Sequence, residues 1–214
     1  MSRRVAQQPW PTTPRPVMLK AAPTPVLRFD KADHEYFIND VKVPHITGML
    51  EATGWIDDTW WTEESCERGT MVHRLAADYD LGAIPDPRSV ECIYKGWFLA
   101  YVALMRVVRP QWKDIETALF DLVRRWGGRP DRVGKLWGAW AVVDLKTGQP
   151  SPATPIQLAL QAILAAPEVG LPPTAMLRYE VRLRATGKGT LIEHRDPNDF
   201  QKAYEVIGKC CTHG

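Results

Sequence analysis

The sequence predicts a mixed α/β (α+β) fold, in which one domain has a central mixed β-sheet flanked by helices. Helix-like apolar repeats occupy the first half of the chain. A three-strand meander follows, and then helix, strand and helix alternate to the C-terminus, which is typical of this class. The 214 residues suffice for one sizeable hydrophobic core and are short for two.

The N-terminal part divides into an arm and the start of the domain. Residues 1–25 are rich in proline and are expected to form a flexible arm, so that the domain spans 26–214. A hairpin is predicted next, with arms at Val26–Phe29 and Tyr36–Ile38 around a polar turn. Pro44–Gly54 then predicts a short helix.

Two longer helices are predicted before the sheet. Thr62 is followed by two acids, which suits the N-cap and first turn of a helix. From about Ser89 to Val108, apolar residues recur at intervals of three and four, and Pro110 stops the pattern.

The spacing of apolar residues then changes to the alternation typical of strands, and helices and strands both follow to the C-terminus. Strands are predicted at Ile115–Val123, at Arg129–Val133 after a turn at Gly127-Gly128, and at Trp137–Leu145. The remaining predicted elements are a helix at Pro152–Ala166, a hairpin of Met176–Arg184 with Thr190–His194, and a final amphipathic helix at Asp196–Lys209.

Composition excludes several classes of protein. No apolar run reaches the ~18 residues of a membrane span, so no membrane partner is expected. The N-terminus lacks a secretory signal, and its prolines disfavour the amphipathic helix of a mitochondrial transit peptide. The four cysteines contain no CxxC pair, so neither a zinc site nor an iron–sulfur cluster is expected. The net charge of +2 neither demands nor excludes nucleic acid.

One constellation carries chemistry. Asp131 and Asp144 lie on strands that a turn can pair, and two adjacent carboxylates repel each other unless a cation lies between them. Oxygen ligands suit Mg²⁺ or Mn²⁺. Lys146 shares a strand face with Asp144, where an ammonium group could orient water or neutralise a phosphate. The alternative is a solvated strand face, because an isolated Asp-x-Lys is common.

These residues resemble the signature of the PD-(D/E)xK nucleases, and their surroundings resemble the RecB-like exonuclease branch of that superfamily. The resemblance spans about residues 43–205 and implies a restriction-endonuclease-like core. The motifs that carry it, in chain order, are Pro44-His45-Ile46-Thr47-Gly48-Met49-Leu50, Arg68-Gly69-Thr70-Met71-Val72-His73, Glu116, Pro130-Asp131, Asp144-Leu145-Lys146 and Gln157. Two departures are His45 in place of serine and Gln161 in place of tyrosine.

The resemblance implies roles for individual residues. The implied catalytic residues are Asp131, Asp144, Lys146, Glu116 and Gln157. The implied metal ligands are Asp131, Asp144, the Leu145 carbonyl and His73. The predicted nucleic-acid contacts are Arg125, Arg129, Arg132 and Gln161. Simpler interpretations are a core or surface histidine for His73, a solvated glutamine for Gln157 and a charged hairpin surface for the arginines.

The sequence therefore predicts a metal-dependent DNA exonuclease acting in replication, repair or recombination. DNA with single-stranded or duplex ends would be its substrate, and a recombination or replication protein a possible partner. The expected location is the cytoplasm of a bacterium or phage-infected host, with mitochondria as second choice. The alternatives are a structure- or sequence-selective endonuclease and a catalytically silent DNA-binding subunit. Trp60 and Trp61 could stack on unpaired bases or pack in the core.

Overall fold

A computed structural model describes residues 24–56 and 62–211. Almost all of the predicted N-terminal arm lies outside the described residues, as do Trp60 and Trp61. The interpretations of these segments therefore stay predictions. Within the two described ranges, no helix is long and apolar enough to cross a membrane.

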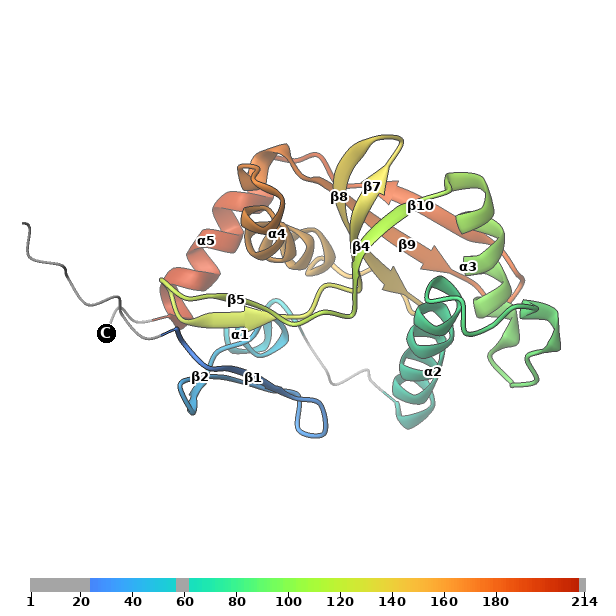
Figure 1. Cartoon of the computed structure of the whole chain (residues 1–214), viewed down its shortest axis with the longest axis horizontal. Coiled ribbons are helices and arrows are strands. Elements are labelled where there is room, and N and C mark those ends of the chain that lie inside the picture. Colours follow the sequence, from blue (N-terminus) through green and yellow to red (C-terminus); the bar gives the residue numbers. More distant parts are fainter. Residues whose placement is uncertain (1–23, 57–61, 212–214) are drawn as a thin grey trace, which may run out of the picture.

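A five-stranded sheet in the order β10-β9-β8-β7-β4 forms the centre of the molecule (Figure 1). Its strands are β4 (Gln111–Ile115), β7 (Arg132–Leu136), β8 (Ala139–Lys146), β9 (Leu177–Leu183) and β10 (Gly189–Glu193). β8 and β9 run parallel, whereas the other neighbours are antiparallel. The sheet is therefore mixed, which confirms the predicted fold class.

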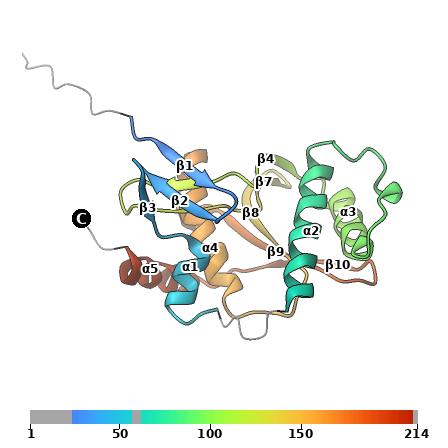
Figure 2. The same ribbon diagram turned by 90° about the horizontal axis from the view of Figure 1, so that it is seen from below.

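Helices cover both faces of this sheet (Figure 2). The helices are α1 (Ile46–Ala52), α2 (Glu63–Asp80), α3 (Lys95–Val108), α4 (Thr154–Ala165) and α5 (Asn198–Cys210), with 3-10 turns η1 (Pro87–Ser89), η2 (Pro167–Val169) and η3 (Pro173–Ala175). β8 alternates between the two cores. Val142 packs with α1, α4 and α5, and Val143 and Leu145 pack with α2 and α3. Even-numbered residues of β8 therefore face α4.

Two small sheets lie beside α1. The first contains β1 (Leu27–Asp30), β2 (Glu35–Ile38) and β3 (Val41–Val43), and the second contains β5 (Leu119–Asp121) and β6 (Trp126–Gly128). The sheet of β1, β2 and β3 is called the small sheet below. The pair of β5 and β6 links it to the rest of the domain, because the Gly127 amide donates to the Pro44 carbonyl at 2.9 Å.

Four predicted elements were wrong in position or type. The strand predicted at Arg129–Val133 is β7, which runs from Arg132 to Leu136 and leaves Asp131 in the preceding connection. The proposed strand Ile115–Val123 is interrupted at Glu116, whose φ of 51° lies in the left-handed region, so β4 and β5 belong to different sheets. Gly127-Gly128 is part of β6 instead of a turn. A Cβ on Gly128 would lie 2.4 Å from Ile46 Cδ1, so close packing requires the glycine. The helix predicted from Ser89 begins only at Lys95, after η1.

Candidate active site

The end of β8 places two charged side chains on the face of the sheet that α4 covers. Asp144 is buried, with 1% of its surface exposed, and Lys146 follows two residues later on the same face. Lys146 Nζ lies 2.7 Å from Asp144 Oδ2. The predicted Asp-x-Lys pair is thus an ion pair beneath a helix, and the alternative of a solvated strand face is excluded for Asp144.

Helix α4 supplies two amides to the same carboxylate. Gln157 and Gln161 are one turn apart, so both project from one side of the helix. Gln157 Nε2 donates to Asp144 Oδ1 at 2.8 Å, and Gln161 Nε2 donates to the same oxygen at 2.9 Å. Gln157 Oε1 also accepts from Lys146 Nζ at 2.9 Å. Gln157 is therefore an orienting partner of both charged groups.

This arrangement corrects the interpretation of Gln161 as a nucleic-acid contact. Its side chain is buried, and its amide nitrogen is committed to Asp144. Its carbonyl oxygen is also buried and has no hydrogen-bond partner among the described residues. Gln161 fixes the position of the carboxylate instead of meeting a solvent-exposed phosphate.

Asp131 lies between β6 and β7 and reaches both β8 and α2. Its Oδ2 accepts from the Leu145 amide at 2.6 Å. Its Oδ1 lies 3.3 Å from Nδ1 of His73, which projects from α2. The other ring nitrogen of His73, Nε2, lies 3.0 Å from the Leu145 carbonyl oxygen. The structure thus places Asp131 and the Leu145 carbonyl at the two ring nitrogens of His73, and their implied role as metal ligands stays a prediction.

Glu116 joins this group from the break between β4 and β5. Its amide donates to the Asp131 carbonyl at 3.0 Å, which explains how a residue with positive φ is held there. Its Oε1 lies 3.7 Å from His73 Nδ1 and has no hydrogen-bond partner among the described residues. Ligand atoms of His73, Glu116 and Asp131 all lie within 4.8 Å of one another.

The pKa values of the residues in and beside this cluster indicate that it stabilises positive charge. Burial alone would lower the pKa of His73, but the Asp131 and Glu116 carboxylates raise it to about 10. Burial would raise the pKa of Asp131, whereas His73, the Leu145 amide and Lys146 hold it at about 2. Burial raises the pKa of Asp144 against the opposing attraction of Lys146. The two carboxylates thus favour positive charge at this position, and a metal ion bound there would replace the proton on Nδ1 of His73.

The residues present fit a divalent cation. Glu116 Oε1 is a buried carboxylate oxygen that no described donor satisfies, and it points into the same space as Asp131 Oδ1 and His73 Nδ1. Two carboxylates with an imidazole suit a divalent metal ion. Asp144, predicted as a ligand, is not one of the three residues in this cluster. Its Oδ1 accepts from the two glutamines, whereas its buried Oδ2 faces Lys146 and has no hydrogen-bond partner among the described residues, so its role as a ligand stays a prediction.

The three arginines predicted to contact nucleic acid lie in different environments in the structure. Arg132 is fully buried, and its Nε lies 2.6 Å from Asp80 Oδ2. Its prediction as a nucleic-acid contact was wrong, because no part of its side chain reaches solvent. Arg129 lies beside the cluster, with Nε 3.3 Å from Glu116 Oε2. Arg125 lies in the β5–β6 turn, at the far end of that ribbon from Arg129.

Asp80 is a site neighbour that the sequence reasoning missed. It is the last residue of α2 and, seven residues after His73, lies on the same helical face two turns later. Arg132 connects Asp80 to the acidic cluster. Its Nη1 donates to the Asp131 carbonyl at 2.6 Å and lies 3.6 Å from Glu116 Oε1. The spacing of seven between a candidate ligand and an acid was the available signal.

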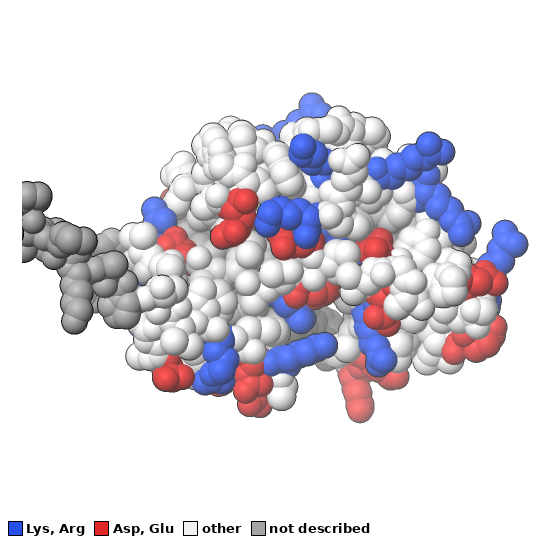
Figure 3. Space-filling model, in the orientation of Figure 1, with Lys and Arg blue, Asp and Glu red and all other residues white. Residues whose placement is uncertain are grey.

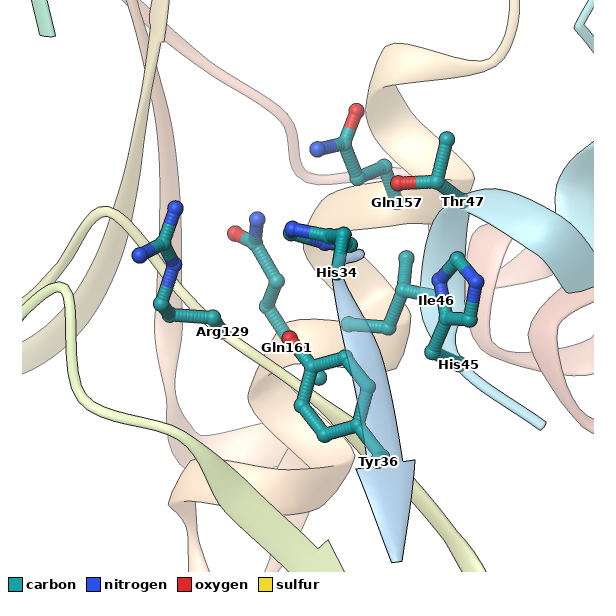
Figure 4. A pocket seen from close by; sticks show the side chains of 9 residues that line it. His34, Tyr36, His45, Ile46, Thr47, Arg129, Gln157 and Gln161 are labelled. Atoms are coloured by element: carbon teal, nitrogen blue, oxygen red, sulfur yellow. The ribbon is translucent and has the colours of Figure 1, made fainter. Parts of the chain in front are cut away.

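A small cavity of about 30 Å³ adjoins the Asp144 side of the site (Figure 4). Arg129 lies across it from Gln157 and Gln161 on α4, while His34 and Tyr36 form a wall from the small sheet. The Tyr36 hydroxyl is buried and has no partner among the described residues. The small sheet therefore closes one side of the site.

The face of the molecule around these residues is hollowed between α2 and the lobe that carries α1 and β1 (Figure 3). Basic and acidic side chains both lie at the rim of this hollow. A mixed sheet with an acidic cluster and a lysine at one strand end, open to a hollow, is the arrangement expected of a metal-dependent nuclease.

The sequence comparison identifies the family. The profile of the PD-(D/E)XK nuclease superfamily matches residues 60–212, and the chain belongs to that superfamily. A solved structure from Eubacterium rectale, provisionally named an exonuclease, is similar at 15% identity and a TM-score of 0.45, covering 76% of this chain and 69% of its own. No curated protein matches the sequence.

Proposed function

We propose that this nuclease is a metal-dependent DNA exonuclease of the RecB-like branch, which hydrolyses phosphodiester bonds from DNA ends. The observation that carries the proposal is the convergence of three potential ligand groups within 4.8 Å, beside a buried Asp144–Lys146 pair. Superfamily membership supports hydrolytic chemistry at this position. Roles in replication, repair or recombination, and a cytoplasmic location, belong to the same proposal.

Glu116, Asp131 and His73 would hold the cation, with the Leu145 carbonyl directed at the same imidazole. When bound, the ion would supply a Lewis acid and lower the pKa of water. Lys146 would orient the attacking water or neutralise charge developing on the phosphate. Gln157 would hold the Lys146 and Asp144 side chains in position relative to each other, because it forms hydrogen bonds with both.

The small sheet supports exonuclease over endonuclease action. A strand that crossed the site would need free passage on both sides of Asp144 and Lys146. His34 and Tyr36 instead narrow the side next to Gln157 and Gln161, where they line a cavity of about 30 Å³. A strand that terminates there is accommodated, while a continuous strand is obstructed. Arg129 at this wall would contact the terminal phosphate.

The test is digestion of end-labelled linear DNA and of closed circles, with Mg²⁺, with Mn²⁺ and with excess EDTA. We expect progressive shortening of linear DNA with either metal and intact circles. Asp131→Asn should lower the rate by ~10²-fold or more, because a metal-holding carboxylate is lost. Asp78→Asn, an exposed change on the same helix as His73, serves as the matched control.

Three outcomes would change the assignment. Discrete fragments from closed circles would replace the exonuclease by the endonuclease alternative. DNA binding without cleavage in any metal would favour the silent subunit. Full activity in EDTA would remove the metal from the mechanism.

A further inference from the structure

A second, larger cavity lies on the other side of Lys146, at the carboxyl ends of β8 and β9. Its volume is about 370 Å³, which is within the range of pockets that take nucleotide-sized ligands. Helices α2 and α3 form one wall, and the β8–α4 and β9–β10 loops form the other. A Cβ on Gly96 would lie 2.0 Å from the Ala185 carbonyl oxygen, so α3 packs closely against the β9–β10 loop. This contact fixes α3 against the β9–β10 loop.

The charge of this cavity has one sign. Arg68, Arg182 and Arg184 line it, and none of its described lining residues is acidic. Arg182 is paired with Glu180 at 2.7 Å, but Arg68 and Arg184 make no ion pair with a described acid. Arg68 Nε is buried and has no acceptor among the described residues. A buried donor without a partner is costly, so this group favours an anionic ligand.

An aromatic surface accompanies these cations. Trp97 is half-buried on the wall from α3, and the Arg68 guanidinium lies 5.4 Å from its ring centroid. An arginine and an indole ring that line the same cavity are a combination with which proteins bind unpaired nucleotides, since the arginine meets phosphate and the ring packs against a base. Thr147 adds a hydroxyl to the lining.

The cavity adjoins the candidate catalytic site. Thr147 directly follows Lys146, and Arg182 is the register partner of Lys146 across β8 and β9. Neighbouring strands are about 4.8 Å apart, so the basic lining begins next to the catalytic lysine. A nucleotide in the cavity could thus belong to the strand whose phosphate lies at Asp144.

We infer that this cavity, the Arg68–Trp97–Arg184 groove, binds a single-stranded segment of DNA next to the scissile phosphate. The inference rests on the proposed nuclease function and names its substrate class. A cavity of this volume holds nucleotides of one strand, whereas the paired strand of a duplex finds no room between its walls. The groove therefore selects single-stranded DNA, with phosphates on Arg68 and Arg184 and a base against Trp97.

The first test measures binding without turnover. Fluorescence anisotropy in EDTA gives the Kd of the full chain for a fluorescein-labelled 12-nucleotide single strand and for the blunt duplex of equal length. We expect Arg184→Ala and Arg68→Ala each to weaken single-strand binding about 5-fold to 10-fold and to leave duplex binding within twofold. For single strands, each phosphate contact contributes about 0.7 to the slope of the logarithm of affinity against the logarithm of salt concentration. The double variant loses two such contacts and should therefore lower the magnitude of this slope by about 1.4.

Arg106→Ala is the matched control, because Arg106 is an exposed arginine on α3 outside the groove. It should bind as the wild type does. Arg184 is exposed, so its variant keeps the test valid even if Arg68→Ala fails to fold. Equal weakening of single-strand and duplex binding, or none in either variant, would overturn the inference.

A second measurement isolates base stacking. The wild type should bind a 12-nucleotide strand of abasic residues about 5-fold or more weakly than the normal strand, and Trp97→Leu should reduce this gap. An unchanged gap in Trp97→Leu would refute the stacking contact.

The two proposals fail separately. A wild type that degrades DNA, together with arginine variants of unchanged affinity, would refute the groove alone. A wild type that cuts no DNA in any metal, together with arginine variants of reduced affinity, would refute the nuclease alone.

Discussion

Arg132→Leu should destabilise the protein strongly, because it removes the cation from a buried ion pair. The side chains of Arg132 and Asp80 are 0% and 4% exposed, and Nε lies 2.6 Å from the carboxylate oxygen. At an effective dielectric constant of ~20 the attraction is about 6 kcal/mol, which desolvation largely offsets. Removing Arg132 leaves the buried Asp80 carboxylate with the Tyr101 hydroxyl as a donor but without an opposing charge, which costs about 3–5 kcal/mol.

The loss can be measured by thermal and urea denaturation. In a domain of this size each kcal/mol lowers Tm by about 2–4 °C, so we expect a decrease of about 6–20 °C. The companion variants are Asp80→Leu and the double variant Arg132→Leu/Asp80→Leu. The double variant should be more stable than the sum of the single changes predicts, because neither charge is then stranded.

A direct phosphate contact by Arg132 predicts a different result. In that case Arg132→Leu would change the free energy of unfolding by less than about 1 kcal/mol, and it would weaken DNA binding with a shallower salt slope. That combination would refute the assignment of Arg132 to a buried ion pair and restore its prediction as a nucleic-acid contact.

Three further changes test other parts of the site. Lys146→Ala should lower the single-turnover cleavage rate by ~10²-fold or more while DNA affinity stays within a few-fold, as expected of a group that acts on the reacting phosphate. Gln161→Leu removes a donor to Asp144 and should lower the same rate by about 10-fold, with Tm nearly unchanged because its other polar atom is already unpartnered. Gly128→Ala places a Cβ 2.4 Å from Ile46 Cδ1 and should cost about 1–3 kcal/mol in urea unfolding, part of which Ile46→Val should restore.

The elements with strong local patterns could be predicted from the sequence. The helix that carries His73 begins at Thr62, as its capping pattern indicated, and Thr62 and Ser65 form a capping box. The hydrophobic run before Asp144 correctly indicated a strand covered on both faces. Spacing along this strand also placed Lys146 on the face of Asp144.

The features that long-range packing decides could not be predicted. The break at Glu116 depends on a hydrogen bond to Asp131, fifteen positions later in the chain, and no local signal encodes it. Arg132 is polar and follows other arginines, so composition suggested an exposed residue. Only the fold shows that β7 passes under the end of α2, where Asp80 meets the guanidinium.

Leu145 shows how the apolar core fixes the polar site. Its amide donates to Asp131 and its carbonyl faces His73, while its side chain packs between α2 and α3. Because side chains alternate along a strand, a shift of β8 by one residue would direct Leu145 at α4 and remove Asp144 and Lys146 from the site. Such a shift would move the charged Asp144 and Lys146 into the apolar core between β8 and helices α2 and α3, away from Gln157 and Gln161, and burying charges without partners is costly. The register of β8 therefore sets the positions of the candidate catalytic groups, and Leu145, itself without a reactive side chain, connects the acidic cluster to the lysine.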